Sequence, residues 1–184
     1  FDPRGLSKGG VDPWNAETDP ERVFVHEHIR MLDGLKLGEG FLLGTVGACW
    51  GGAAKVARSK AEAIALGVYF TLTIAPTDTQ KVSFQSLSIH LQRPAENAPN
   101  AYQWQYRLGS GDFQDIGSEG QCAENDSLGN ALPPAELANI PELQNVTEPV
   151  EFRIVFWNGS PHGRIGIGRR PGAMFLINGE TNPR

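Results

Sequence analysis

The chain is short of several features that would place it in a familiar class. Its 184 residues include only two cysteines, Cys49 and Cys122. A chain of this length buries about 70% of its unfolded surface, so it needs no disulfide to fold. No apolar run approaches the roughly 20 residues of a membrane-spanning helix, so we expect no membrane span. No signal peptide is visible and the chain begins at Phe1 rather than Met, which indicates a mature or trimmed form.

Clustered positive charge is also absent. The net charge is −5 and the basic residues are scattered along the chain. Binding to nucleic acid phosphates requires a concentrated basic face, so we expect no nucleic acid partner.

What the sequence does contain is alternation of apolar and polar residues with a period of two. It occurs in four stretches, 70–74, 87–92, 102–106 and 152–156. This period places one set of side chains on a buried sheet face and the other in water. The 22 glycines and 13 prolines supply many turns between such strands. The pattern therefore predicts an all-β fold, an antiparallel two-sheet β-sandwich.

The chain divides into an irregular N-terminal arm, 1–20, and a single β-sandwich domain, 21–184. Glycines and prolines in the arm leave no room for a regular element. One short α-helix is predicted at about 53–66, where alanines are frequent, and it ends at Gly67. Further strands are predicted at 23–25 and 31–37, and the second is expected to be interrupted at Asp33 and Gly34. The apolar positions change phase between Phe84 and Leu87, which predicts a β-bulge near Gln85 and Ser86.

The two cysteines allow two interpretations. A disulfide between Cys49 and Cys122 would close a loop of about 70 residues and contribute on the order of 4 kcal/mol through the unfolded state. Two cysteines in a protein rich in glycine and proline suit an oxidising compartment. The alternative is two unrelated buried thiols.

The order of elements carries a resemblance. Its segments are Ala-Glu-Ala-Ile-Ala-Leu-Gly (61–67), Val-Tyr-Phe-Thr-Leu-Thr-Ile-Ala-Pro (68–76), Ser-Phe-Gln-Ser-Leu-Ser-Ile-His-Leu-Gln-Arg (83–93), the Tyr/Trp strand, Val-Glu-Phe-Arg-Ile-Val-Phe-Trp (150–157) and Phe-Leu-Ile-Asn-Gly (175–179). Over residues 35–180 the chain resembles jelly-roll modules of secreted and surface-anchored bacterial proteins, including those with PEP-CTERM sorting signals. The resemblance implies a carbohydrate-binding-module-like fold and an extracellular or cell-surface location. It assigns no functional residue.

Two opposite rows of the strand at 101–108 are candidate ligand-binding surfaces. Tyr102, Trp104 and Tyr106 share one face at intervals of about 6.8 Å, a spacing at which rings can stack on sugars. If these rings point into the core instead, the opposite row of Gln103, Gln105 and Arg107 becomes the candidate. We then expect Ser88, His90 and Gln92 of the preceding strand to join that row. Amides, hydroxyls, histidine and arginine suit a polyhydroxylated ligand.

The strand at 152–156 adds two further candidates. Arg153 lies on its polar side, and Trp157 stands beside a loop, where it could form an exposed platform. The sequence leaves open which of these side chains contacts a ligand.

Metal and catalytic sites have weaker signals. Calcium is possible near five carboxylates, Asp112, Asp115, Glu119, Glu124 and Asp126, because they could supply oxygen ligands. The His26-Glu27-His28 triplet places two imidazoles on one strand face, where a transition metal could bind. Residues 47–50, Gly-Ala-Cys-Trp, resemble the nucleophile segment of papain-like proteases, but the remaining parts of that site are missing. We therefore expect no enzyme and no cofactor.

These observations favour a noncatalytic extracellular module that binds a polysaccharide or glycan on a sheet face or rim loops. The alternative is a structural or adhesive surface subunit that assembles with copies of itself through its N-terminal arm.

Overall fold

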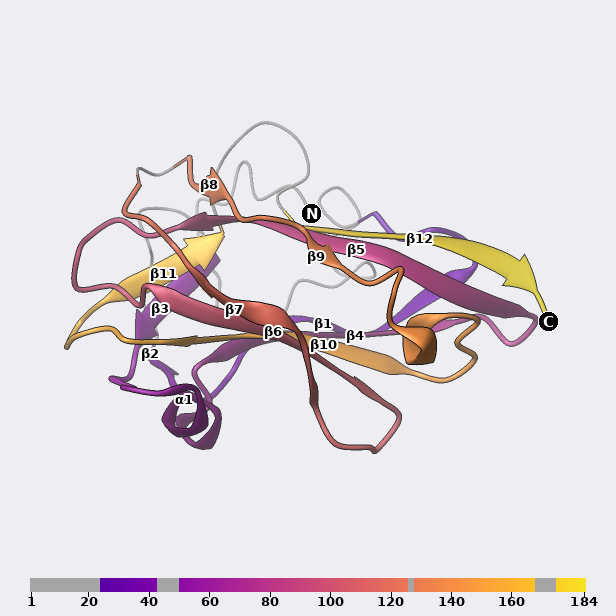
Figure 1. Cartoon of the computed structure of the whole chain (residues 1–184), viewed down its shortest axis with the longest axis horizontal. Coiled ribbons are helices and arrows are strands. Elements are labelled where there is room, and N and C mark those ends of the chain that lie inside the picture. The colour runs from indigo at the N-terminus through magenta and orange to yellow at the C-terminus, as the bar shows by residue number, and fades with distance from the viewer. Residues whose placement is uncertain (1–23, 43–49, 126–127, 168–174) are drawn as a thin grey trace.

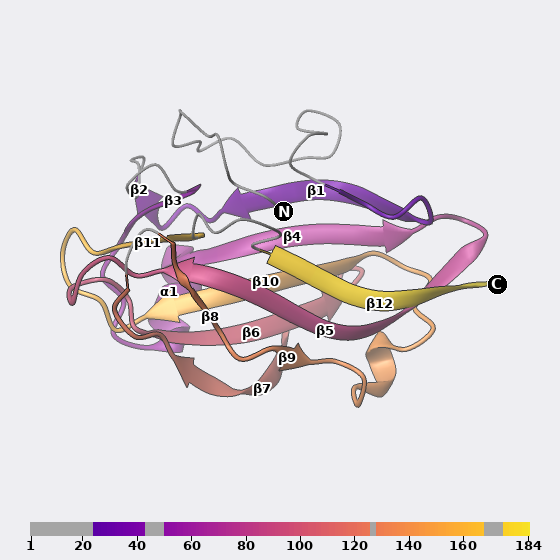
Figure 2. The same cartoon turned by 90° about the horizontal axis from the view of Figure 1, so that it is seen from above.

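The computed structural model describes residues 24–42, 50–125, 128–167 and 175–184. Figures 1 and 2 show two antiparallel sheets that face each other, with one helix on the outer side of one sheet. The predicted antiparallel two-sheet sandwich is confirmed. The predicted arm, 1–20, lies outside the described residues.

The described elements follow one another in the order β1 (Ile29–Leu37), β2 (Phe41–Leu42), β3 (Trp50–Ala54), α1 (Lys60–Leu66), β4 (Tyr69–Pro76), β5 (Gln80–Gln92), β6 (Ala101–Leu108), β7 (Gln114–Gln121), β8 (Asn130–Ala131), β9 (Ala135–Glu136), the 3₁₀ turn η1 (Pro141–Leu143), β10 (Val150–Trp157), β11 (Arg164–Ile167) and β12 (Phe175–Pro183). Within the described ranges, no helix has the length and apolar character to cross a membrane.

One sheet has five strands in the order β1-β4-β10-β6-β7. The facing sheet runs β12-β5-β11-β3-β2, and the short strands β8 and β9 also pair with β5. The chain changes sheet from β4 to β5, from β5 to β6 and from β10 to β11, as in a jelly-roll-like sandwich. Strands that are consecutive in sequence are therefore often not neighbours in a sheet.

Aromatic rings fill much of the interior between the sheets. Phe70 lies with its ring centroid 4.8 Å from Phe156, 5.0 Å from Trp50 and 5.2 Å from Phe41. Phe84 of β5 meets Phe152 of β10 at 5.2 Å and thereby joins the two sheets. Such tilted and edge-to-face pairs contribute about 0.5–1.5 kcal/mol each beyond the area they bury.

The predicted bulge in β5 is confirmed. In the ladder with β12, Ser86 pairs with Asn178 but Phe84 pairs with Gly179, so Gln85 is the extra residue. The bulge lets Phe84 and Leu87 both point inward although two residues separate them.

The helix is shorter than predicted and begins later. Ala53 and Ala54 belong to β3, where Ala53 pairs with Arg164 of β11, so sheet pairing overrides the helix propensity of alanine. Ser59 caps α1, because its Oγ accepts a hydrogen bond from the Glu62 amide at 3.2 Å. The helix ends at Gly67, which has a φ of 75°, as the sequence predicts.

The N-terminal strands also differ from expectation. Phe24 and Val25 do not form a strand, and Phe24 is 91% exposed. Strand β1 begins at Ile29, before the predicted start, and its pairing with β4 is interrupted on both sides of Asp33. That interruption agrees with the break expected at Asp33 and Gly34.

Candidate functional site

The three aromatic side chains of β6 belong to the core. Tyr102, Trp104 and Tyr106 are each less than 7% exposed, and the Trp104 ring lies 5.9 Å from that of Phe175 in the facing sheet. Burial raises the pKa of the Tyr102 and Tyr106 hydroxyls. The rings therefore stabilise the sandwich and do not form an exposed stacking platform.

Trp157 is not exposed either. It is 7% exposed and packs with the other buried apolar residues. Helix α1 contacts β10, and the amide of Asn158 donates to the carbonyl of Ala57 at 2.7 Å. The segment that leads into α1 therefore lies against the end of β10, and Trp157 does not form the exposed platform that the sequence left open.

His90 does not join the outward row of β6. It lies on β5 in the other sheet, opposite Ala131 of β8. Ser88 and Gln92 share that strand, and Gln92 is buried. The expected common surface is not assembled, because the chain crosses between sheets from β5 to β6.

The outward row of β6 does gather with other side chains, although its first member has a structural role. Gln103 is 1% exposed and donates from Nε2 to the carbonyl oxygen of Ile116 at 2.8 Å. This bond stabilises the β6–β7 pairing where its register shifts between Tyr102 and Trp104. Gln103 is therefore not available to a ligand.

Arg153 and Gln105 are the buried part of a polar network on the outer side of the five-stranded sheet. The Arg153 Nε donates to Gln105 Oε1 at 2.7 Å, and Gln105 Nε2 donates to Asp115 Oδ1 at 2.6 Å. Lys60 of α1 bonds the other Asp115 oxygen at 2.6 Å. The network thus joins β10, β6, β7 and the helix.

The Arg153 guanidinium is enclosed by aromatic rings. Its Cζ lies 3.5 Å from the Phe113 ring centroid and 5.3 Å from that of Tyr69. Burial lowers the pKa of Arg153, while the neighbouring Tyr69 and Glu151 act in the opposite direction. Phe113 therefore shields Arg153 from water, and cation–π attraction contributes to holding both side chains in place.

A second, more exposed part of the network lies beside the first. Arg107 donates from Nε to Glu151 Oε2 at 2.7 Å, and Thr71 Oγ1 donates to Glu151 Oε1 at 2.6 Å. The Arg107 side chain is 37% exposed and that of Glu151 is 17% exposed. The hydrogen bond between Arg107 and Glu151 is charge-assisted and holds both side chains in place. Both side chains are still in contact with solvent.

A hollow continues this surface toward the helix. It has a volume of about 320 Å³ and lies between α1, the end of β1 and the start of β4. Tyr69 and Thr71 line it together with Lys36 and Glu39. Since Tyr69 contacts Arg153 and Thr71 binds Glu151, the hollow and the network form one surface.

We call this surface the outer polar face. Its members come from β4, β6, β7, β10, α1 and the β6–β7 loop, and they are Lys60, Tyr69, Thr71, Gln105, Arg107, Phe113, Asp115, Glu151 and Arg153. Figure 1 shows that α1 and the β6–β7 loop project from the same side of the five-stranded sheet, away from the facing sheet. The sequence analysis found Gln105, Arg107 and Arg153. It missed Tyr69, Thr71 and Glu151, whose signal was polar alternation on β4 and β10.

Neither of the metal sites that the sequence allows finds support in the described part of the chain. Among the residues that the structure describes, no group of three His, Cys, Asp or Glu side chains could hold a metal ion. Asp115 is engaged by Lys60 and Gln105, and Asp126 lies outside the described residues. His26 accepts a hydrogen bond at Nδ1 from the amide of His28, and their rings lie 5.1 Å apart.

The expected disulfide also finds no support. Cys122 is buried and has a free thiol whose pKa is raised by burial. Its Sγ lies 3.6 Å from the carbonyl oxygen of Ala123. Cys49 lies outside the described residues, as does most of the segment at 47–50, and Trp50 at its end is fully buried.

Comparison with protein-family models, with curated proteins and with solved structures finds no match to this chain. The resemblance to surface-protein modules therefore stays a prediction.

Proposed function

We propose that this chain is a noncatalytic extracellular module that binds a glycan on the outer polar face of its five-stranded sheet. The observation that carries the proposal is the continuity between the hollow beside α1 and the Arg107–Glu151 pair. Thr71 lines the hollow and bonds Glu151, and Tyr69 lines the hollow beside Arg153, so a ligand lying across this surface would meet a ring, a hydroxyl, a carboxylate and a guanidinium.

The side-chain chemistry suits a sugar. Glu151 accepts hydrogen bonds and Arg107 donates them, which matches hydroxyl groups that do both. The Tyr69 ring offers an apolar face to the C–H groups of a pyranose. Both polar side chains are already held by partners within the protein, so little conformational entropy is lost when a ligand binds.

The charges favour a neutral glycan. Lys60 is paired with Asp115 at 2.6 Å, and Arg107 is paired with Glu151. Each cation in these two pairs thus has an acidic partner. Each carboxylate is likewise engaged by a cation, an arrangement that fixes the side chains rather than supplying an acid or base. This supports a binding role without catalysis.

Affinity electrophoresis tests the proposal. Native gels cast with soluble neutral polysaccharides should retard the wild-type chain, and Tyr69→Ala should abolish the retardation. His90→Ala, in the other sheet, is the control and should migrate as the wild type does. Retardation of no polysaccharide would contradict the proposal. Large species in size-exclusion chromatography that disappear when residues 1–20 are deleted would favour the self-assembling surface subunit instead.

A further inference from the structure

A second hollow of the surface lies on a different part of the molecule, at the open edge between the two sheets. A cleft of about 490 Å³ separates β1 of one sheet from β12 of the other. It reaches down to core residues, including Ile74 of β4 and Phe84 of β5. Volumes of this size are usual for small-molecule sites lined mainly by apolar side chains.

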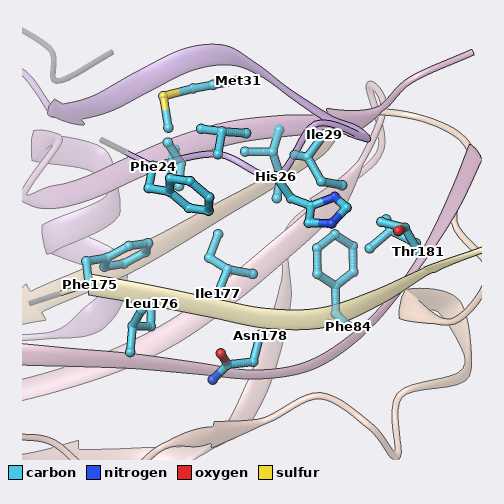
Figure 3. Close-up of a pocket in the computed structure, with 15 residues that line it drawn as sticks. Phe24, His26, Ile29, Met31, Phe84, Phe175, Leu176, Ile177, Asn178 and Thr181 are labelled. Carbon is cyan, nitrogen blue, oxygen red and sulfur yellow. The ribbon is translucent and has the colours of Figure 1, made fainter. Parts of the chain in front are cut away.

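The cleft has an apolar end and a polar end. Figure 3 shows Phe24, Met31 and Phe175 together at one end, while the His26 ring and Thr181 lie near Phe84 at the other. Ile177 lies between them on β12. Such a distribution suits a ligand with a long apolar body and one polar terminus.

The dimensions favour a single hydrocarbon chain. Six residue steps separate Phe175 from Thr181 on β12, which corresponds to about 20 Å of strand. The acyl chain of one membrane leaflet spans about 15 Å, half of a hydrocarbon core of about 30 Å. The cleft, with a volume of about 490 Å³, therefore has the length and the apolar lining for one extended hydrocarbon chain.

The flanking strands disfavour a peptide as the occupant. Pairing of β1 with β4 shifts register on both sides of Asp33, and irregular edges with charged side chains oppose the addition of a further strand. On β12 the outward positions include Asn178 and Glu180, and the strand ends at Pro183. Neither β1 nor β12 therefore offers an edge that a strand of a second copy could pair with readily.

We propose that this cleft binds one molecule of a free long-chain fatty acid. Its chain lies along Ile177 and Met31, and its carboxylate meets the imidazole of His26 and the hydroxyl of Thr181. This site is separate from the outer polar face, and it does not depend on glycan binding.

A fluorescence titration with a polyene fatty acid tests the proposal on the full chain. We expect saturable binding of one probe molecule per chain and its displacement by dodecanoate. Met31→Trp fills the cleft and should weaken probe binding at least tenfold. Leu32→Trp places the same ring at the next residue, which is 46% exposed and outside the cleft lining, and should change the affinity less than twofold.

A second variant covers the case in which Met31→Trp disturbs folding. His26→Ala alters an exposed side chain and should weaken dodecanoate at least fivefold more than it weakens dodecanol, which lacks the carboxylate. The proposal is overturned if the wild type shows no saturable binding, or if the Met31 and Leu32 variants respond alike. It is also overturned if the chain elutes as a dimer that Met31→Trp converts to a monomer, because a second copy would then occupy the cleft.

Discussion

At the scale of single residues, Arg153 is a buried cation on the outer side of the five-stranded sheet. Arg153 is only 9% exposed, so its guanidinium needs interactions within the protein to replace water. Gln105 provides a hydrogen-bond acceptor, and the Phe113 ring provides a cation–π contact. Gln105 also donates a hydrogen bond to Asp115, so one amide side chain connects a buried cation to a surface carboxylate. The geometry of the outer polar face depends on this amide.

Replacing that amide should therefore destabilise the protein. Gln105→Leu leaves Arg153 Nε without its acceptor and removes a donor from Asp115, and an unsatisfied buried polar group costs about 1–3 kcal/mol. We expect a decrease of about 2 kcal/mol in the free energy of unfolding, measured in urea. Gln85→Leu is the matched control, because Gln85 also bonds a carboxylate, that of Glu180, but on the surface. Equal losses in the two variants would contradict the account.

Acid should weaken the connection between α1 and β7. Burial by itself would raise the pKa of Asp115, but hydrogen bonds from Lys60 and Gln105 and the charges of Lys60 and Arg153 lower it below its ordinary value of 3.8. Because the folded state holds the carboxylate ionised, its contribution is present above that ordinary value and is lost as the pH falls through the lower folded value.

Asp115→Asn tests this pH dependence. The variant should be less stable than the wild type at pH 7, by under about 1 kcal/mol because the carboxylate is partly exposed. The difference should shrink as the pH falls from about 4 toward 2.5, followed by urea unfolding at each pH. Asp78→Asn, at a carboxylate that is 86% exposed, is the control. A difference that grows on acidification would refute the assignment.

At the scale of elements, the end of α1 illustrates how closely packed loops select glycine. Gly67 has a φ of 75°, and a Cβ there would lie 3.0 Å from the amide nitrogens of both Glu39 and Gly40. Gly117 in β7 has a similar φ of 64° but no atom within 4 Å of an added Cβ. A residue with a side chain would incur the free-energy cost of a left-handed backbone at both positions. Only at Gly67 would its Cβ also crowd neighbouring backbone atoms.

The pair makes a direct comparison possible. Gly117→Ala should cost about 1 kcal/mol of unfolding free energy from the left-handed backbone alone. Gly67→Ala should cost roughly twice as much, since the β1–β2 turn must also move, and both are measured by thermal unfolding. If the two variants lose the same stability, the turn is not tightly packed against the helix end.

At the scale of the whole molecule, periodicity sufficed to predict the sandwich, and the phase change at Gln85 sufficed to predict a bulge. Both are local patterns that a buried sheet face imposes on sequence. The sequence could not predict that His90 lies in a different sheet from Gln105 and Arg107. Which strands are neighbours depends on where the chain crosses between sheets, and no local pattern records that. Glu151 was overlooked for the same reason: its partners Thr71 and Arg107 lie 80 and 44 residues away in sequence.

The outer polar face and the cleft differ in the chemistry of the side chains that line them. The outer polar face carries paired charges and half-exposed side chains, whereas the cleft between β1 and β12 is apolar at one end and opens toward the core. Separate variants can therefore alter one site and leave the other intact.

The most direct measurement is isothermal titration of the oligosaccharide whose parent polysaccharide retards the chain most. Glu151→Gln keeps the shape of the side chain but removes the charge that binds Arg107 and that, in the proposed complex, accepts from a sugar hydroxyl. It should weaken binding about tenfold, as expected for loss of a charge-assisted hydrogen bond. Glu180→Gln, on β12 of the other sheet, should bind as the wild type does. Equal affinities for all three proteins, or no heat of binding to the wild type, would contradict a glycan site on this face.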